Sequence, residues 1–175
     1  MKLKDVKVAI LTISDKGSRG EREDTSGPEI QKIVEAEGAQ VISYEIVADE
    51  QYEIEKKLIR LADFGGADLI LTTGGTGFSL RDVTPEATLA VIERQAPGFV
   101  EAIRAESLKI TPHAMLSRAV SGIRGQTIII NLPGSQKAVR ESLAVIMPAL
   151  PHGSQILRGQ AGECATNLKE SSQPR

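Results

Sequence analysis

Three short, nearly continuous apolar runs constrain the fold of this chain more than any other feature. They cover residues 7–13, 68–71 and 127–132, and beyond its first residue none of them holds a charged side chain. Strands of this composition are usually covered on both faces, as in a parallel sheet with helices on either side. The segments between the runs carry apolar residues at helical spacing, so strands should alternate with helices. We therefore expect an α/β protein, a three-layer αβα sandwich with a mostly parallel sheet.

The other elements follow from apolar spacing and from the positions of glycine and proline. A helix is expected from 28 to 37, with Ser26 or Gly27 at its cap and Gly38 at its end. Residues 117–123 and 127–132 flank a tight turn, which leaves one edge strand of the sheet able to run antiparallel. The remaining predictions are a strand at 40–47 and helices at 50–61, 84–95, 99–108, 111–116, 136–146 and 154–158.

The length of the chain indicates how it is divided into domains. At 175 residues it has the size of one domain that can bury a sizeable core. We expect a single domain over residues 1–160, followed by a polar tail, 161–175, that is partly disordered.

Charge and cysteine content exclude several classes of protein. The formal net charge of −2 is unlike the basic excess of a nucleic-acid-binding protein. The one cysteine, Cys164, excludes an internal disulfide, and no Cys/His cluster has zinc spacing. The first apolar run is far shorter than a signal peptide or the roughly 20 residues of a membrane span. We expect a cytoplasmic protein that binds neither nucleic acid nor membrane.

The stretch from Thr72 to Ala87 places a glycine-rich turn, four threonines, an arginine and an aspartate between a predicted strand and a predicted helix. Its glycines allow positive φ and close approach of a ligand, so that N–H groups can face phosphate oxygens. Thr84, Pro85 and Glu86 have the hydroxyl cap, proline and acid of a helix start. The spacing matches neither a Walker A loop nor GxGxxG. A purely structural turn is the alternative, but Arg81 and Asp82 favour an anion and metal site over an exposed ion pair.

Other polar clusters also follow predicted strands. Ser14 and Asp15 come after the first strand, Asp49 after the second, and a further glycine turn, 133–135, after the last. In open α/β sheets ligands bind at the carboxyl ends of the strands, so these clusters should converge on one edge. Alternatives stay open: loop 14–27 as a solvated loop, Asp49 as a helix cap, and residues 131–135 as a turn and cap.

Residues 72–87 resemble the signature of the molybdopterin-binding domain family, in particular the molybdopterin adenylyltransferases of the MogA/MoaB type. Ser14-Asp15, the piece from Asp24 to Pro28 and the turn 131–135 are similar to the family as well, although Gln136 replaces its usual proline. The resemblance covers about residues 6–158. It implies adenylylation of the terminal phosphate of molybdopterin by Mg-ATP, with release of pyrophosphate, in molybdenum cofactor biosynthesis. It also implies a homotrimer, which in some members pairs into a hexamer.

This reaction joins two polyanions, and its attacking phosphate oxygen is already ionised at neutral pH. Cations are therefore needed more than a general base, and His113, which has no catalytic partner nearby in sequence, is interpreted as structural. We hypothesise that Asp49 and Asp82 bind Mg²⁺ and are catalytic together with Arg81, which offsets negative charge. The residues expected to bind phosphate, pterin or nucleotide are Ser14, Asp15, Asp24, Ser26, Thr73, Gly74, Gly75, Thr76, Gly77, Thr84, Pro133, Gly134 and Ser135.

Two other functions compete with the enzyme. The first is a non-catalytic molybdopterin-binding or carrier protein of the same fold, which has lost the transfer step. The retention of both Asp49 and Asp82 argues against it. The second is an unrelated nucleotide-binding module, or a homologous domain of a molybdenum insertase or a competence-related protein.

Overall fold

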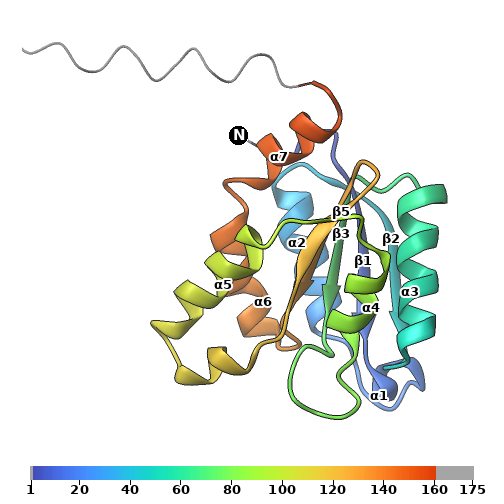
Figure 1. Cartoon of the computed structure of the whole chain (residues 1–175), viewed down its shortest axis with the longest axis vertical. Helices are drawn as coiled ribbons and strands as arrows, with labels where there is room; N and C mark the ends of the chain where they lie inside the picture. Colours follow the sequence, from blue (N-terminus) through green and yellow to red (C-terminus); the bar gives the residue numbers. More distant parts are fainter. Residues whose placement is uncertain (1, 161–175) are drawn as a thin grey trace, which may run out of the picture.

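One mixed sheet lies between two layers of helices (Figure 1). The structure is a computed structural model that describes residues 2–160. Within that range the strands are β1 (Lys7–Ile13), β2 (Gln40–Val47), β3 (Leu69–Thr73), β4 (Arg94–Gln95), β5 (Ser121–Arg124) and β6 (Thr127–Leu132). Their order is β2-β1-β3-β6-β5-β4. The pairs β2–β1, β1–β3 and β3–β6 are parallel, and the pairs β6–β5 and β5–β4 are antiparallel.

The helices cover both faces of the sheet. They are α1 (Asp15–Ser18), α2 (Ser26–Ala36), α3 (Gln51–Ile59) with a π-helical turn η1 (Arg60–Phe64), α4 (Thr84–Val91), α5 (Gly98–Leu108), a 3₁₀ helix η2 (Pro112–Leu116), α6 (Gln136–Ile146) and α7 (Leu150–Leu157). Helices α3 and α4 pack against one face, and α2, α5, α6 and α7 against the other (Figure 1). The predicted α/β three-layer αβα sandwich is confirmed.

Two apolar cores stabilise this arrangement, one on each face of the sheet. Side chains alternate between the faces of a strand, so Val8 and Ile10 of β1 belong to the core under α2, α5 and α6, whereas Ala9 and Leu11 belong to the core under α3 and α4. All four are fully buried. This explains why the sequence of β1 is apolar at successive positions, and it holds the carboxyl ends of the parallel strands in one row.

The antiparallel edge differs in detail from the predicted elements. The helix expected to reach residue 95 ends at Val91, and Arg94–Gln95 forms strand β4. The amide of Glu93 donates to the carbonyl of Ile123, and a Cβ on Gly122 would lie 2.7 Å from the carbonyl oxygen of Arg94. Close pairing with β5 therefore overrides the local helical pattern.

Several other helix and strand boundaries differ from the predicted ones. β5 begins at Ser121 instead of residue 117, because the amide of Arg118 donates to the carbonyl of Thr76, in the glycine-rich loop. α7 begins at Leu150 instead of residue 154. The loop 14–27 contains the short helix α1, which was not predicted; its cap is Ser14, whose Oγ accepts a hydrogen bond from the amide of Gly17.

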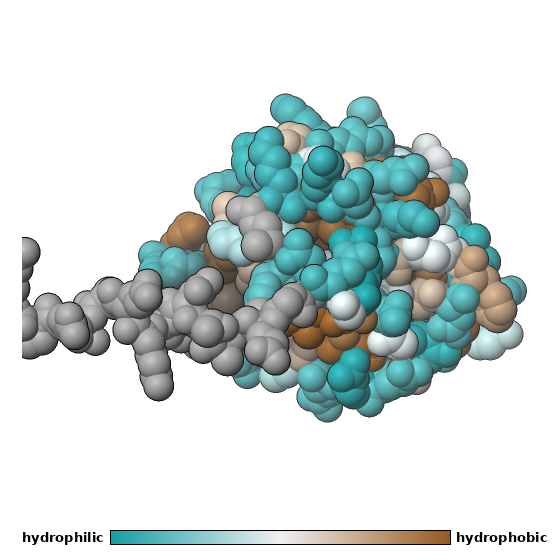
Figure 2. All heavy atoms as spheres, turned by 90° about the horizontal axis from the view of Figure 1, so that it is seen from above, coloured by the Kyte–Doolittle hydropathy of each residue, from teal (hydrophilic) through white to brown (hydrophobic). Residues whose placement is uncertain are grey.

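The two ends of the sheet differ in character. At the carboxyl ends of β1, β2 and β3 lie α1 and the loop between β3 and α4, at the bottom of Figure 1. The opposite end, seen from above in Figure 2, has a mostly hydrophilic surface with hydrophobic residues in small separate groups. None of the helices within residues 2–160 is long and apolar enough to cross a membrane. The expected polar tail, 161–175, lies outside the described residues, so the division into a domain and a tail stays a prediction.

Candidate active site

A polar cleft of about 280 Å³ opens at the carboxyl ends of the parallel strands. Nine residues that the sequence singled out line it: Ser14, Asp24, Ser26, Asp49, Thr73, Gly74, Gly75, Asp82 and Gly134. The structure thus brings together segments from four places in the chain, as expected for strand ends that meet at one edge.

The two glycine turns face each other across this edge. The Thr73 hydroxyl donates to the carbonyl of Pro133 over 2.7 Å, and a Cβ built on Gly134 would lie 3.4 Å from the Cα of Gly74. Gly74 has φ +96°, and a Cβ there would lie only 2.3 Å from the carbonyl oxygen of Ile13. Only glycine fits that position. The Ser26 hydroxyl donates to the carbonyl of Gly134 over 2.7 Å and joins the start of α2 to the second turn.

Asp49 and Asp82 enter the same cleft from different loops. A Cβ on Gly75 would lie 3.2 Å from Asp49 Oδ1, and one on Gly77 would lie 2.9 Å from Asp82 Oδ2. The glycines therefore leave the space that the two carboxylates occupy. Burial raises the pKa of Asp49, and the negative charges of Asp15 and Asp82 raise it further, against the hydrogen bond from the Asp15 amide. In the lining of the cleft, acidic side chains thus outnumber the basic side chains that could offset their charge.

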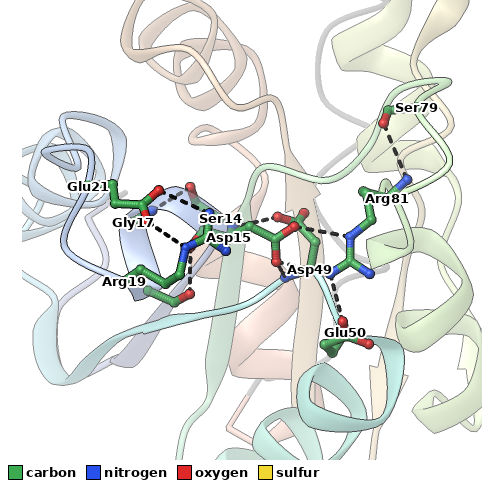
Figure 3. Close-up of polar contacts among 10 residues, drawn as sticks. Ser14, Asp15, Gly17, Arg19, Glu21, Asp49, Glu50, Ser79 and Arg81 are labelled. Atoms are coloured by element: carbon green, nitrogen blue, oxygen red, sulfur yellow. Dashed lines mark hydrogen bonds and ion pairs between the residues drawn. The ribbon is translucent and has the colours of Figure 1, made fainter.

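Asp49 is held by Asp15 through two reciprocal hydrogen bonds (Figure 3). The Asp15 amide donates to Asp49 Oδ2 over 2.7 Å, and the Asp49 amide donates to Asp15 Oδ1 over 3.0 Å. The alternative that Asp49 caps a helix is wrong, because the N-cap of α3 is Glu50 and no side chain bonds there.

Arg81 reaches Asp15 from the β3–α4 loop (Figure 3). Its guanidinium donates to both carboxylate oxygens of Asp15 over 3.0 Å, and also to Glu50 over 2.7 Å. The bidentate contact holds the pKa of Asp15 below its usual value. Arg81 is absent from the lining of the cleft, but its positive charge also lowers the pKa of Asp49, against the larger effect of burial.

Asp24 fastens the loop between α1 and α2. Its Oδ1 accepts from the amides of Ser26 and Gly27, and its Oδ2 accepts from the hydroxyls of Thr12 and Tyr44, all within 2.6 to 3.1 Å. Burial works against ionisation, yet these hydrogen bonds together hold the pKa of Asp24 below its usual value. The expected cap of α2 is wrong, because Ser26 and Gly27 are inside that helix and its N-cap is Thr25, while Asp24 accepts from the first amides.

The other predicted site residues lie behind or beside the cleft. Thr84 is fully buried and donates its hydroxyl to the carbonyl of Gly74, so the prediction that it caps α4 is wrong, because Val83 occupies the N-cap. Ser135 caps α6 by accepting from the amide of Ala138. Pro133 lines an apolar hollow of about 230 Å³ beside α5. Outside the cleft lining lie Asp15, Thr76, Gly77, Arg81, Thr84, Pro133 and Ser135.

Sequence reasoning missed a residue that holds the β3–α4 loop. Arg118 donates to the carbonyl of Gly77 over 2.7 Å, to the carbonyl of Asp82 over 2.5 Å and to the carboxylate of Glu86. The sequence placed Arg118 in a strand, and no local signal connects it with a loop about 40 residues earlier. Glu50, Thr12 and Arg22 were missed in the same way, because a site contact leaves no periodicity in the chain.

A divalent cation fits the acids of the cleft. Among residues 2–160, no three His, Cys, Asp or Glu side chains gather as a complete metal site. Asp49 and Asp82 could supply two carboxylates, which suits Mg²⁺ because that ion is usually bound by one or two carboxylates together with substrate phosphates and water. Burial is the main cause of the raised pKa of Asp49, and the negative charges of Asp15 and Asp82, which a cation would offset, raise it further.

Comparison with known proteins gives a consistent picture. Residues 9–152 match the family described as the probable molybdopterin binding domain. The molybdopterin adenylyltransferase of Helicobacter pylori (strain J99) is 45% identical over 159 residues, which cover 90% of each chain. That of Escherichia coli (strain K12) is 36% identical over 97% of this chain and 94% of its own. The solved structure of the molybdopterin biosynthesis enzyme MoaB from Thermus thermophilus has a TM-score of 0.83 and 50% identity over 88% of this chain and 97% of its own.

Proposed function

The chain belongs to the family of molybdopterin-binding domains, and from this membership we propose that its cleft transfers the adenylyl group of ATP to the terminal phosphate of molybdopterin. The protein is thus a nucleotidyltransferase of molybdenum cofactor biosynthesis, with ATP and molybdopterin as its substrates. A non-catalytic carrier is not favoured, because relatives that align over nearly their whole length are named as the enzyme.

One observation carries the proposal: two glycine turns and two carboxylates converge on one cleft. Within residues 2–160, the backbone amides of Gly75 and Gly134 donate no hydrogen bond, so both are available to phosphate oxygens. Amides that already face a ligand need little reorganisation when charge develops in the transition state. Such a cleft supports the transfer of a charged adenylyl group better than the binding of a neutral ligand.

The chemistry follows from the charges. A terminal phosphate oxygen of molybdopterin attacks the α-phosphorus of ATP, a new P–O bond forms, and the bond from that phosphorus to the bridging oxygen of the β-phosphate breaks. Pyrophosphate leaves with the electron pair of the broken bond. The attacking oxygen is already ionised, so no general base is required. The described part of the cleft accordingly has no histidine in its lining.

Asp49 and Asp82 would hold a Mg²⁺ ion, which when bound offsets phosphate charge and orients the triphosphate. Asp15 fixes the carboxylate of Asp49 through their paired hydrogen bonds. Arg81 is a positioning residue, because it holds Asp15 in the ionised, bidentate arrangement. The remaining residues that we propose to bind phosphate, pterin or nucleotide form the rest of the wall and its backing: Ser14, Asp24, Ser26, Thr73, Gly74, Gly75, Thr76, Gly77, Thr84, Pro133, Gly134 and Ser135.

We further propose a cytoplasmic homotrimer, with pairing of trimers into a hexamer as the larger form. Two large apolar side chains of the β3–α4 loop support self-association, since Phe78 is 67% exposed and Leu80 is 99% exposed. The presence of only one cysteine in the sequence supports a reducing compartment.

The direct test of the function is pyrophosphate release from Mg-ATP in the presence of purified molybdopterin. Asp82→Asn should keep its fold by circular dichroism and lower the turnover number by about 100-fold or more, because a neutral amide binds the cation poorly. Asp63→Asn is the matched control, because Asp63 pairs with Arg124 and is absent from the cleft lining.

Near-normal turnover of Asp82→Asn would remove Asp82 from the mechanism. A wild-type protein that binds molybdopterin but releases no pyrophosphate would restore the carrier alternative and contradict the proposed reaction.

A further inference from the structure

Arg22 occupies an unusual position in the cleft. Four acidic residues line that cleft, and Arg22 is the one lysine or arginine among the residues described in its lining; the acids are Glu23, Asp24, Asp49 and Asp82. Arg22 is exposed, and it makes no hydrogen bond or ion pair with any other residue between 2 and 160. An unpaired guanidinium thus borders a cleft that has to accept two polyanions.

Neighbouring arginines are already engaged. Arg19 pairs with Glu21, Arg81 with Asp15 and Glu50, and Arg118 with Glu86. Each of these guanidinium groups offsets a carboxylate of the protein itself. Among the residues described, 2–160, Arg22 has no such carboxylate partner, so its charge remains available to a ligand.

The chain on either side of Arg22 is fixed. Before it, the Arg19–Glu21 ion pair closes the end of α1 over 2.8 Å. After it, Asp24 ties the loop to β1, β2 and the start of α2. Arg22 and Glu23 therefore form a short segment held by contacts on both sides. The backbone of Arg22 stays at the edge of the cleft, while its long side chain can change conformation.

We propose that Arg22 binds the phosphate groups of the substrate in this cleft. This inference rests on the proposed function and adds a binding residue to it. The planar guanidinium donates two parallel hydrogen bonds to a phosphate, which gives both attraction and orientation. The phosphate can belong to the nucleotide or to the pterin, and the two sources are separable by experiment.

The experiment measures binding by isothermal titration calorimetry for wild type and Arg22→Ala. The probes are Mg-ATP, Mg-pyrophosphate, AMP and purified molybdopterin. Removing a charged donor should lower the affinity for the phosphate-bearing probe that Arg22 contacts by about ten-fold. The ratio of the variant to the wild-type dissociation constant should become smaller at high salt. Lys16→Ala is the matched control, since Lys16 is an exposed cation of the same loop whose side chain makes no hydrogen bond or ion pair within residues 2–160 and does not line the cleft. The melting temperature of Arg22→Ala should equal that of wild type, because Arg22 makes no hydrogen bond or ion pair in the described part of the chain.

The pattern of losses identifies the phosphate. Weaker binding of Mg-ATP and Mg-pyrophosphate with unchanged binding of AMP would place Arg22 at the β- and γ-phosphates. Weaker binding of AMP as well would place it at the α-phosphate. A loss for molybdopterin alone would place it at the acceptor phosphate. Wild-type affinities of Arg22→Ala for all four probes, or an equal loss of affinity in Lys16→Ala, would overturn the inference.

The same titrations separate this inference from the proposed function. If wild type binds the probes through Arg22 but releases no pyrophosphate, the proposed reaction fails and the binding residue stands. If the reaction proceeds and Arg22→Ala binds all probes normally, the binding residue fails and the reaction stands.

Discussion

The carboxylate of Asp24 accepts two hydrogen bonds at each of its oxygens, so it fastens the loop as well as lining the cleft. The sequence assigned Asp24 to substrate binding, and the structure adds a loop-fastening contact that explains its lowered pKa. Residues near a ligand often serve to hold the chain that the ligand contacts, and a single sequence does not separate the two roles.

Asp24 makes a pH-dependent contribution to stability. Its folded pKa is lower than the unfolded value of about 3.9, so its stabilisation is fully present above that pH and is lost as the pH falls through the lower folded pKa. Asp24→Asn should cost about 1–3 kcal/mol at pH 7 in urea unfolding, and this difference from wild type should shrink below about pH 4. Glu23→Gln is the control, as Glu23 makes no hydrogen bond within residues 2–160. A difference that stays constant down to pH 2 would contradict the assignment.

At the scale of elements, the β3–α4 loop depends on a side chain from the approach to β5. Arg118 binds carbonyls at both ends of the segment 77–82 and the carboxylate of Glu86 on α4. Asp82 lies at the end of that segment, so the geometry of a proposed metal ligand is set by a residue from another part of the chain. The segment that leads into β5 thereby contributes to the site without entering the cleft.

Arg118→Ala should therefore loosen the loop. We expect faster amide hydrogen exchange across residues 77–82 and a lower turnover number, by about ten-fold, because misplaced catalytic groups lose their alignment. Arg118→Lys should restore little of the lost turnover, since one ammonium group cannot donate to the same three acceptors as the planar guanidinium. Arg124→Ala, which breaks a distant pair with Asp63, is the control for general destabilisation. Unchanged exchange in the loop of Arg118→Ala would show that other contacts hold it.

At the scale of the whole molecule, the sheet with two cores is a rigid base for one functional edge. The loops at that edge are tied to the base by hydrogen bonds of Asp24, Thr73 and Arg118. The apolar side chains that remain exposed on the β3–α4 loop, Phe78 and Leu80, lie next to the site and are available to a second copy of the chain.

We predict that sedimentation equilibrium gives a mass about three times the 18.7 kDa of one chain for a trimer, or about six times that of one chain for a hexamer. The physical reason is the burial of apolar surface, which contributes about 25 cal/mol per Å². Substrate should leave the mass unchanged. A mass of one chain over a wide range of protein concentration would contradict the proposed trimer and leave the proposed reaction intact.

Much of this protein follows from its sequence. Three apolar runs specify buried parallel strands, because each residue of such a run must meet a core on one face or the other. The glycine-rich turn indicates a backbone with positive φ, which the structure has at Gly74 and Gly75 but not at Gly77. Parallel strands end at the same edge, and this rule alone placed Ser14, Asp49 and Asp82 near one another.

Only the tertiary structure decided how the polar groups pair. Arg81 and Asp15 are 66 residues apart, and Arg118 and Gly77 are 41 apart, so no local pattern records either contact. The end of α4 and the existence of β4 were likewise decided by pairing with β5. Local sequence fixes backbone preferences and burial over a few residues, whereas the partner of a charged side chain depends on which distant segments the packed cores bring within 3 Å.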